Sequence, residues 1–299
     1  MSLLVVGTTA LDSIKTPYAE NPRLLGGSAS HAAVAASFFT KTHLVGAVGD
    51  DFPRKYINLY RKHGLNLDGL QQLAGQTFHW SGEYEVNMNN RRTLDTVLGV
   101  IENFSPTLPV AYTKLPYVLL ANIAPKVQRQ VLDQMKRPKF IVADTMDLWL
   151  NIALPSVLKL LKRIDCLVLN DSEAFQLVGE DNVVAAIPLI HKLGPKYVIV
   201  KKGEHGSILS GPIGLFIAPA YPLRKVVDPT GAGDSFVGGL MGYLARKEGS
   251  VVKNLRAAII HGSVTASFCC EGFGLQKTTR IKKADISKRV RELTRMVAW

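Results

Sequence analysis

The feature that most limits the possible folds of this chain is a series of short, almost continuously apolar runs of strand length. They lie at residues 3–7, 43–49, 117–123, 139–145, 166–170 and 197–203. Runs that are apolar on both faces are typical of strands covered on both sides. Helical patterns separate many of them, at residues 30–39, 53–64, 126–135, 182–194 and 235–247. This order predicts an α/β fold with a doubly wound, mostly parallel sheet and helices on both faces.

Two segments depart from this order and predict a small, separate β-sheet. In "TFHWSGEYEV" (77–86) apolar and polar residues alternate, which indicates a strand with one solvated face. Its apolar side is formed by Phe78, Trp80, Tyr84 and Val86. Residues 13–25 are too long for an ordinary βα loop. We expect residues 13–25 and 76–100 to form a lid where ligands bind in such folds; the alternative is a surface hairpin.

The length and composition indicate one globular unit. The chain has 299 residues, of which 47% are hydrophobic, so a substantial core is expected and disorder is not. We expect a single domain over residues 1–299 that includes the lid. No apolar run reaches the roughly 18 residues of a membrane span, and the first residues lack the basic region of a signal peptide. We therefore expect no membrane partner.

The three cysteines predict a reducing compartment. They are Cys166, Cys269 and Cys270, an odd number, and none has the spacing of metal ligands. This pattern is typical of a cytoplasmic protein without structural disulfides.

The net charge of +12, from 36 Lys and Arg against 24 Asp and Glu, would suit nucleic acid or a small polyanion. The densest basic cluster covers residues 280–295, and the apolar residues in and beside it predict an amphipathic helix. Its apolar face is formed by Ile286, Val290, Leu293 and Val297. No aromatic residues alternate with the basic ones, so we expect no nucleic-acid partner.

The stretch "VVDPTGAGDSF" (226–236) carries the clearest chemistry. A helix is expected from Ser235, so small residues lie at its N-terminus and leave backbone amides open to an anion such as a phosphoryl group. These residues are Gly231, Ala232 and Gly233. Asp234 would face the same anion and accept a proton from an attacking hydroxyl. The alternative is a capping acid after a glycine turn.

The chain has no P-loop, no complete dinucleotide fingerprint and no protein-kinase catalytic loop. Instead, "DPTGAGDSFVGG" resembles the C-terminal signature of the ribokinase-like carbohydrate kinases, also called the phosphofructokinase B type. Other segments resemble this family's motifs in the family's order: "LGGSASHAAVAASFF", "LNDSEAFQLVG", "VIVKKGEHGSIL" and "GSVTASFCCEGFG". The matches run from about residue 3 to residue 275, which is nearly the whole chain.

The resemblance implies a ribokinase-like fold and an ATP-dependent kinase that phosphorylates a hydroxyl of a small sugar. Asp234 is the implied general base, and the backbone of residues 231–234 is the implied anion hole. A nucleoside kinase on the same fold is the alternative, because Phe78 and Trp80 on the lid would stack on a base or on a sugar. Intact "GAGD" and "NDSE" motifs disfavour a non-catalytic nucleotide- or nucleic-acid-binding protein. An exposed lid edge would also allow a homodimer.

For the acceptor, the resemblance implies a site near the first strand. Asp12 binds hydroxyl groups, and Gly26 and Gly27 let the acceptor approach the backbone. His31 takes a position where sugar-binding members usually have Asn, so the identity of the acceptor stays open. A turn residue is the alternative for Asp12.

For the nucleotide, the resemblance implies contacts from Asn170, Glu173, Lys202, Gly203, Gly206, Thr230, Gly231, Gly233 and His261. Glu173 would act on Mg²⁺ through water, as hard oxygen chemistry suits that ion; the alternative is a helix start. Asp228 and Thr230 fall where many members hold a monovalent cation, so K⁺ is a candidate activator. For His261 a packed position on its helix is the alternative.

Overall fold

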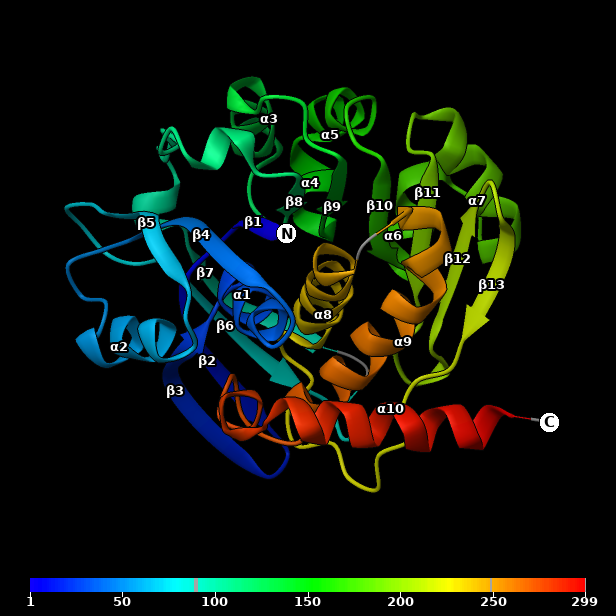
Figure 1. Ribbon diagram of the computed structural model, residues 1–299. Coiled ribbons are helices and arrows are strands. Elements are labelled where there is room, and N and C mark those ends of the chain that lie inside the picture. Colours follow the sequence, from blue (N-terminus) through cyan, green and yellow to red (C-terminus); the bar gives the residue numbers. More distant parts are fainter. Residues whose placement is uncertain (89–90, 248, 299) are drawn as a thin grey trace.

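A computed structural model describes residues 1–88, 91–247 and 249–298. Within them the main element is a nine-stranded sheet in the order β13-β12-β11-β10-β9-β8-β1-β4-β5 (Figure 1). Neighbours from β11 to β5 run parallel, and β12 and β13 are antiparallel. The strands are β1 (Ser2–Val6), β4 (Lys41–Val48), β5 (Asn66–Gln72), β8 (Tyr117–Leu120), β9 (Phe140–Asp144), β10 (Cys166–Asn170), β11 (Tyr197–Lys201), β12 (Ser207–Gly211) and β13 (Gly214–Ala218).

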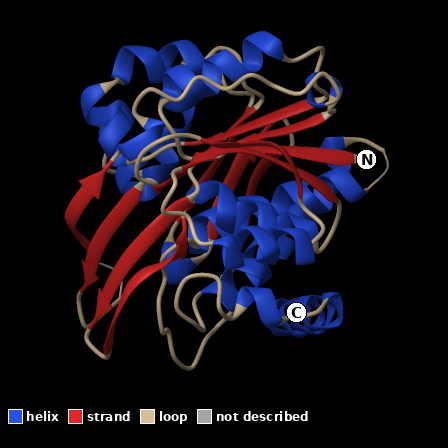
Figure 2. Ribbon diagram, turned by 90° about the vertical axis from the view of Figure 1, so that its left-hand side faces the viewer, coloured by secondary structure: helices blue, strands red, loops and turns tan. Residues whose placement is uncertain are grey.

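Helices cover both faces of this sheet, as Figure 2 shows. One layer contains α1 (Ser28–Ser37), α2 (Arg54–Lys62), α8 (Ala232–Arg246) and α9 (Val251–Cys269). The other contains α3 (Pro125–Gln134), α4 (Asp147–Ile152), α5 (Leu154–Leu161), α6 (Asp171–Val178) and α7 (Val183–Lys192). Alternate strand residues serve the two cores: Leu3 packs into one and Leu4 into the other. The predicted doubly wound α/β fold is confirmed.

Short and terminal elements complete the described chain. The single-turn helices are η1 (Gly99–Ile101), η2 (Tyr112–Lys114), η3 (Gly203–His205) and η4 (Thr278–Arg280). The last helix is α10 (Lys283–Val297), which packs on α9 through buried Ile286 and Leu293. Val297 was expected on the same face but is exposed, because it lies at the end of the helix beyond that contact. In the described ranges, no helix has the length and apolarity needed to cross a membrane.

The predicted small sheet is present and stands apart from the main one. Its order is β3-β2-β6-β7, with β2 and β6 parallel and the outer pairs antiparallel. The strands are β2 (Ala10–Thr16), β3 (Ala19–Gly26), β6 (His79–Tyr84) and β7 (Arg91–Val97). Trp80 and Tyr84 are buried as the alternation predicts, but Val86 is exposed, since β6 has already ended at Tyr84. We call these four strands the lid sheet.

Two further differences from the sequence expectations concern element boundaries. Helix α8 begins at Ala232, not at Ser235, so the small residues belong to its first turn. Strands β12 and β13 were not expected, because no helix separates them from β11 and the strand–helix alternation gives no signal there. Strand β5 was not expected because its sequence, NLDGLQQ, is mostly polar.

Candidate active site

The N-terminus of α8 forms the centre of the candidate site. Gly231 precedes the helix in a left-handed conformation, with φ 76°, and a Cβ at this position would collide with the ring of His31. Glycine is therefore required here for two separate reasons. The first backbone amides of a helix lack acceptors within the helix. Of the predicted anion hole, the amide of Ala232 donates to the carbonyl of Pro229 at 3.1 Å, which leaves the amides of Gly233 and Asp234 as the candidates for contact with an anion.

Asp234 lies in the first turn of α8 and is half-buried. Burial raises the pKa of this carboxyl to about 7, and the negative charge of Asp144 acts in the same direction. Lys201 and Arg91 oppose the increase in the pKa. A carboxyl with this pKa exchanges protons near neutral pH, which is the property required of a general base.

Asp144 and Lys201 are site residues that the sequence analysis missed. Asp144 is the last residue of β9 and Lys201 the last residue of β11, and these two strands lie on either side of β10. Nζ of Lys201 lies 3.2 Å from Oδ1 of Asp144 and 3.3 Å from Oδ2. Both follow buried strands, and the rule that ligands gather at the carboxyl edge of a parallel sheet would have found them.

Arg91, the first residue of β7, is a third missed residue, and it connects the lid sheet with the site electrostatically. Its positive charge lowers the pKa of both Asp234 and Glu173. Its guanidinium lies 5.7 Å from the centre of the Trp80 ring, and Nη2 is 4.0 Å from Oδ1 of Asp147. No sequence motif marks this residue, because its relevance depends on how the lid sheet is placed relative to the loop that leads into α8.

Asp12 lies on β2 and is buried. Oδ2 accepts a hydrogen bond from the backbone amide of Gly27 at 3.2 Å, and Oδ1 has no hydrogen-bond partner within the described residues. Burial raises its pKa to about 7. A Cβ at Gly26 would collide with this carboxylate, and Gly27 has φ 89°. Gly26 therefore makes room for Asp12, and Gly27 is required by its positive φ and by the nearby backbone of Thr8 and Ala10. The predicted approach of the acceptor to these two glycines stays a prediction.

His31 lies on α1, directly behind the backbone of Gly231. It is only 1% exposed, and Nδ1 is 3.6 Å from Sγ of Cys269. Burial lowers its pKa to about 4, so the imidazole is neutral at physiological pH. The ring supports the glycine turn from within the core, and its contact with an acceptor stays a prediction.

The Asn-x-x-Glu motif starts helix α6 as a capping box. Oδ1 of Asn170 accepts from the amide of Glu173 at 2.7 Å, and Oε2 of Glu173 accepts from the amide of Asn170 at 2.8 Å. Glu173 is buried, which raises its pKa to about 7, while the positive charge of Lys201 opposes this. The helix-start alternative is thus realised in the structure, and the carboxylate still lies within the electrostatic range of Lys201.

Asp228 is fully buried and joins two loops. Oδ1 accepts from the amide of Thr230 and Oδ2 from the amide of Gly274, both at 2.9 Å. The hydroxyl of Thr230 donates to the Tyr84 hydroxyl oxygen at 3.1 Å. The lid sheet is therefore hydrogen-bonded to the loop that leads into α8.

A cleft of about 770 Å³ opens beside α8. Of the predicted nucleotide residues, Gly203, Gly206 and Gly233 line it. Further lining residues include Lys201, Ala232, residues 220–226, residues of the C-terminal half of α9, and Tyr18 and residues 86–88 beside the lid sheet. This volume is sufficient for a nucleotide.

Two of the predicted nucleotide residues, Lys202 and His261, do not line this cleft. The residue that lines the cleft is Lys201, not Lys202, because side chains alternate along a strand and its end. His261 faces away from the cleft: its ring stacks on Tyr243 at 4.0 Å between centroids and meets the edge of Phe39 at 5.8 Å. These contacts agree with the packed alternative, and a contact between His261 and the nucleotide stays a prediction.

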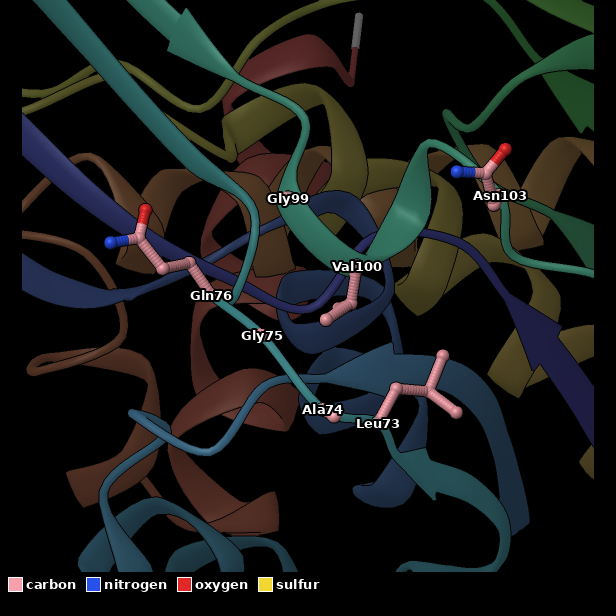
Figure 3. A pocket seen from close by; sticks show the side chains of 7 residues that line it. All are labelled: Leu73, Ala74, Gly75, Gln76, Gly99, Val100 and Asn103. Carbon is pink, nitrogen blue, oxygen red and sulfur yellow. The ribbon is translucent and has the colours of Figure 1, made fainter.

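A second pocket, of about 440 Å³, lies between residues 73–76 and the segment around η1. Figure 3 shows the side chains of Leu73 and Val100 pointing toward the space between the two segments. Its lining contains no titratable side chain, so it offers no acid–base chemistry and is distinct from the site around α8.

Comparison with known proteins agrees with this geometry. Residues 7–282 match the model of a family described as pfkB family carbohydrate kinase. The cytidine kinase of Thermococcus kodakarensis is 28% identical over 252 residues, which are 81% of this chain and 88% of that protein.

Solved structures give the same fold. The nucleoside kinase of Methanocaldococcus jannaschii, described as an archaeal member of the ribokinase family, has a TM-score of 0.77 at 20% identity. The match covers 97% of this chain and 98% of that one. Arabidopsis thaliana ribokinase, solved with ribose and ATP, has a TM-score of 0.76 at 22% identity, with 97% and 98% covered.

Proposed function

Since the chain belongs to the pfkB family of carbohydrate kinases, we propose that it transfers the γ-phosphoryl group of ATP to a hydroxyl of a small sugar. The observation that carries this proposal is the placement of Asp234 in the first turn of α8, with a pKa of about 7, beside open backbone amides and a nucleotide-sized cleft.

In the proposed reaction Asp234 accepts the proton of the acceptor hydroxyl as its oxygen attacks the γ-phosphorus. The new O–P bond forms while the bond between the γ-phosphorus and its bridging oxygen breaks, which leaves ADP. The amides of Gly233 and Asp234 stabilise the charge on the transferring oxygens, as an oxyanion hole does. The proton then leaves Asp234 for solvent.

Asp12 is proposed to hold the acceptor. Its buried Oδ1 has no partner within the described residues, and a buried polar atom without a partner is costly. A substrate hydroxyl that donates to this oxygen would remove that cost. The lid sheet, hydrogen-bonded through Tyr84 to Thr230, would cover the acceptor and exclude water.

Mg²⁺ is proposed to accompany ATP and to neutralise phosphate charge. The described residues contain no group of three or more His, Cys, Asp or Glu that could hold a metal alone. A site with a single carboxylate, such as that of Glu173, fits Mg²⁺, because this ion commonly uses one or two carboxylates together with water and phosphate oxygens. We assign the protein's share to Asn170 and Glu173, acting through water.

Three further properties are part of the proposal. K⁺ is proposed at the loop of Asp228 and Thr230, supported by the buried carboxylate there. A homodimer through the lid sheet is supported by the edge strand β7, in which every residue is exposed. A cytoplasmic location is supported by cysteines that are all free, namely Cys166, Cys269 and Cys270.

A nucleoside is the second candidate acceptor. The similarity to a cytidine kinase extends over most of this chain, and the buried ring of Trp80 on β6 offers an aromatic surface on the lid sheet. Such a surface would stack on a base as well as on a sugar.

The test is acceptor-dependent formation of ADP from ATP and Mg²⁺. Ribose, fructose, cytidine and adenosine are each supplied with and without K⁺. We expect saturable turnover with one of these acceptors, faster with K⁺, and loss of turnover in Asp234→Asn. Absence of acceptor-dependent ADP formation by the folded protein across a broad panel of sugars and nucleosides would contradict the proposed function.

A further inference from the structure

Lys201 is a largely buried cation at the end of β11. Its side chain is 18% exposed, and that of its partner Asp144 is 5% exposed. Removing an ammonium group from water is expensive unless a countercharge and hydrogen bonds replace the solvent. Asp144 supplies both, through contacts of 3.2 and 3.3 Å. The pair therefore holds the ammonium in one place at the carboxyl edge of the sheet.

That place is beside the proposed anion hole. A Cβ added to Gly233 would lie 3.1 Å from Nζ of Lys201, so the ammonium lies directly against the first turn of α8. Lys201 and Gly233 also line the same cleft. An anion bound by the amides of this turn would be within reach of Nζ without movement of the backbone.

The charges around Lys201 make such a contact necessary for a polyphosphate. Asp144, Glu173 and Asp234 all act on Lys201 and raise its pKa against the effect of burial, so it stays protonated. Three carboxyl groups near a triphosphate would repel it, and in a partly desolvated cleft this repulsion is weakly screened. Lys201 is the buried cation that offsets them from the protein side.

We propose that Lys201 is a catalytic residue whose ammonium contacts the transferring phosphoryl group, and that Asp144 is a positioning residue that holds the ammonium beside Gly233. This rests on the proposed kinase function and adds a residue that the sequence motifs did not mark. Lys201 forms no covalent bond. It gives one hydrogen bond to a γ-phosphoryl oxygen while the acceptor proton moves to Asp234 and the bridging oxygen leaves with ADP.

The first variant is Lys201→Met, which keeps most of the length of the side chain and removes its ammonium group. We expect kcat to fall on the order of 10²–10³-fold, as for the loss of one donor to a developing anion. Binding supplies a second readout, measured by competition against a fluorescent nucleotide without acceptor. The ratio of the Kd for β,γ-imido-ATP to the Kd for ADP should rise about tenfold or more, because only the former presents a γ-phosphate to the lysine.

A matched control is Lys196→Met. Lys196 is exposed and directly precedes β11, at the opposite end of this strand from Lys201. The Lys196→Met substitution also removes one positive charge from the protein, but it changes no residue that lines the cleft. We expect kcat and the ratio of the two Kd values to equal those of the wild type.

Lys201→Met leaves the carboxylate of Asp144 buried without its partner, which can destabilise the fold. The double variant Lys201→Met with Asp144→Asn removes this unpaired charge and so controls for misfolding. It replaces the ion pair by two neutral side chains. The two charges act on the pKa of Asp234 in opposite directions, so their removal together has opposing effects on that pKa. The proposal predicts a folded protein that is still slow and still has the raised ratio of Kd values. Recovery of kcat to within about threefold of the wild type would overturn it and reduce the pair to a structural role.

Failure of this inference is distinguishable from failure of the kinase function. If Asp234→Asn abolishes turnover but both Lys201 variants keep wild-type kcat and the wild-type ratio of Kd values, the kinase stands and Lys201 has no catalytic contact. If wild type shows no acceptor-dependent turnover, the ratio of Kd values alone decides: an unchanged ratio in Lys201→Met overturns the contact, and a raised ratio supports it.

Discussion

The lid sheet and the first turn of α8 each contain a carboxyl group of similar pKa, but the electrostatic surroundings of the two groups differ. Asp12, on the lid side, and Asp234, on α8, both have a pKa raised to about 7, and burial is the main cause for each. Near Asp12 the other charges are the acids Asp234 and Asp228. Near Asp234 two cations oppose the increase. The comparison teaches that burial sets the pKa, whereas nearby cations indicate where negative charge develops during the reaction.

The largest expected effect comes from the side with cations. Asp234→Asn keeps the shape of the side chain and removes the base, and general bases typically contribute about 10²–10⁴-fold. We expect kcat to fall by that range while the affinity for ATP and the melting temperature change little. Steady-state kinetics, nucleotide binding and thermal melting give the three values. A folded variant with kcat within about threefold of the wild type would reduce Asp234 to a helix cap.

The next effect tests the geometry of the anion hole. Gly231→Ala forces a side chain into a left-handed turn, where it collides with His31, so the amides should shift and kcat should fall on the order of 10²–10³-fold. The control is Gly64→Ala: Gly64 also has a positive φ, of 70°, but a Cβ there meets nothing within 4 Å. It should cost only about 1–2 kcal/mol of folding stability. Equal kcat for the two variants would contradict the assigned geometry.

On the acceptor side, Asp12→Asn should raise the KM for the acceptor about tenfold or more, because hydrogen bonds to a charged group contribute about 1.5–3 kcal/mol. kcat should change less, since Asp12 moves no proton. Asp95→Asn, an exposed carboxylate of the lid sheet, is the control and should leave KM unchanged. A wild-type KM in Asp12→Asn would remove Asp12 from the acceptor site.

The same variant should show a pH-dependent change in stability. The folded-state pKa of Asp12 is raised, so the folded protein binds more protons than the unfolded chain between the unfolded value and about 7. The protonated carboxyl of Asp12 therefore contributes folding stability at low pH, and this contribution is lost as the pH rises toward 7. Asp12→Asn removes this loss, and its melting temperature should exceed that of the wild type by more at pH 8 than at pH 5. The opposite trend would show that the buried carboxylate is stabilised.

The smallest effect concerns the lid arginine. Arg91 lowers the pKa of Asp234, so Arg91→Met should move the acidic limb of the kcat profile to higher pH. This substitution leaves the other charged groups coupled to Asp234 unchanged, namely Asp144, Lys201 and Asp12. Arg92→Met is the control, because Arg92 pairs with Glu83 on the exposed side of the lid sheet, at 2.7 Å. Identical acidic limbs in the two variants would show that Arg91 does not act on the base.

The sequence predicted the parts of the fold that depend on local pattern. Buried parallel strands are continuously apolar and the helices between them are periodic, so both were recognisable, and the alternation around Trp80 indicated the lid sheet. Strands β12 and β13 were missed because hairpin extension at a sheet edge leaves no helix between strands. Candidate site residues such as Asp234 were also recognisable, because each lies within one short, continuous sequence motif.

Residues that act through the sheet order were not recognisable from motifs. Asp144 and Lys201 are far apart in the chain and meet only because β9 and β11 flank β10. The choice of Lys202 over Lys201 depended on the orientation of one side chain at a strand end. The position of His261 depended on which face of α9 packs on Tyr243. Such features follow from tertiary packing and not from local sequence.

The central claim is that Asp234 takes the acceptor's proton, and the pH dependence of kcat tests it most directly. For the wild type we predict that kcat rises with pH through an apparent pKa of about 7 and then levels off, since the base must be deprotonated. For Asp234→Asn we predict a much lower kcat in which this limb is absent. The same limb in Asp234→Asn, carried by Asp12 or Glu173, would contradict the claim.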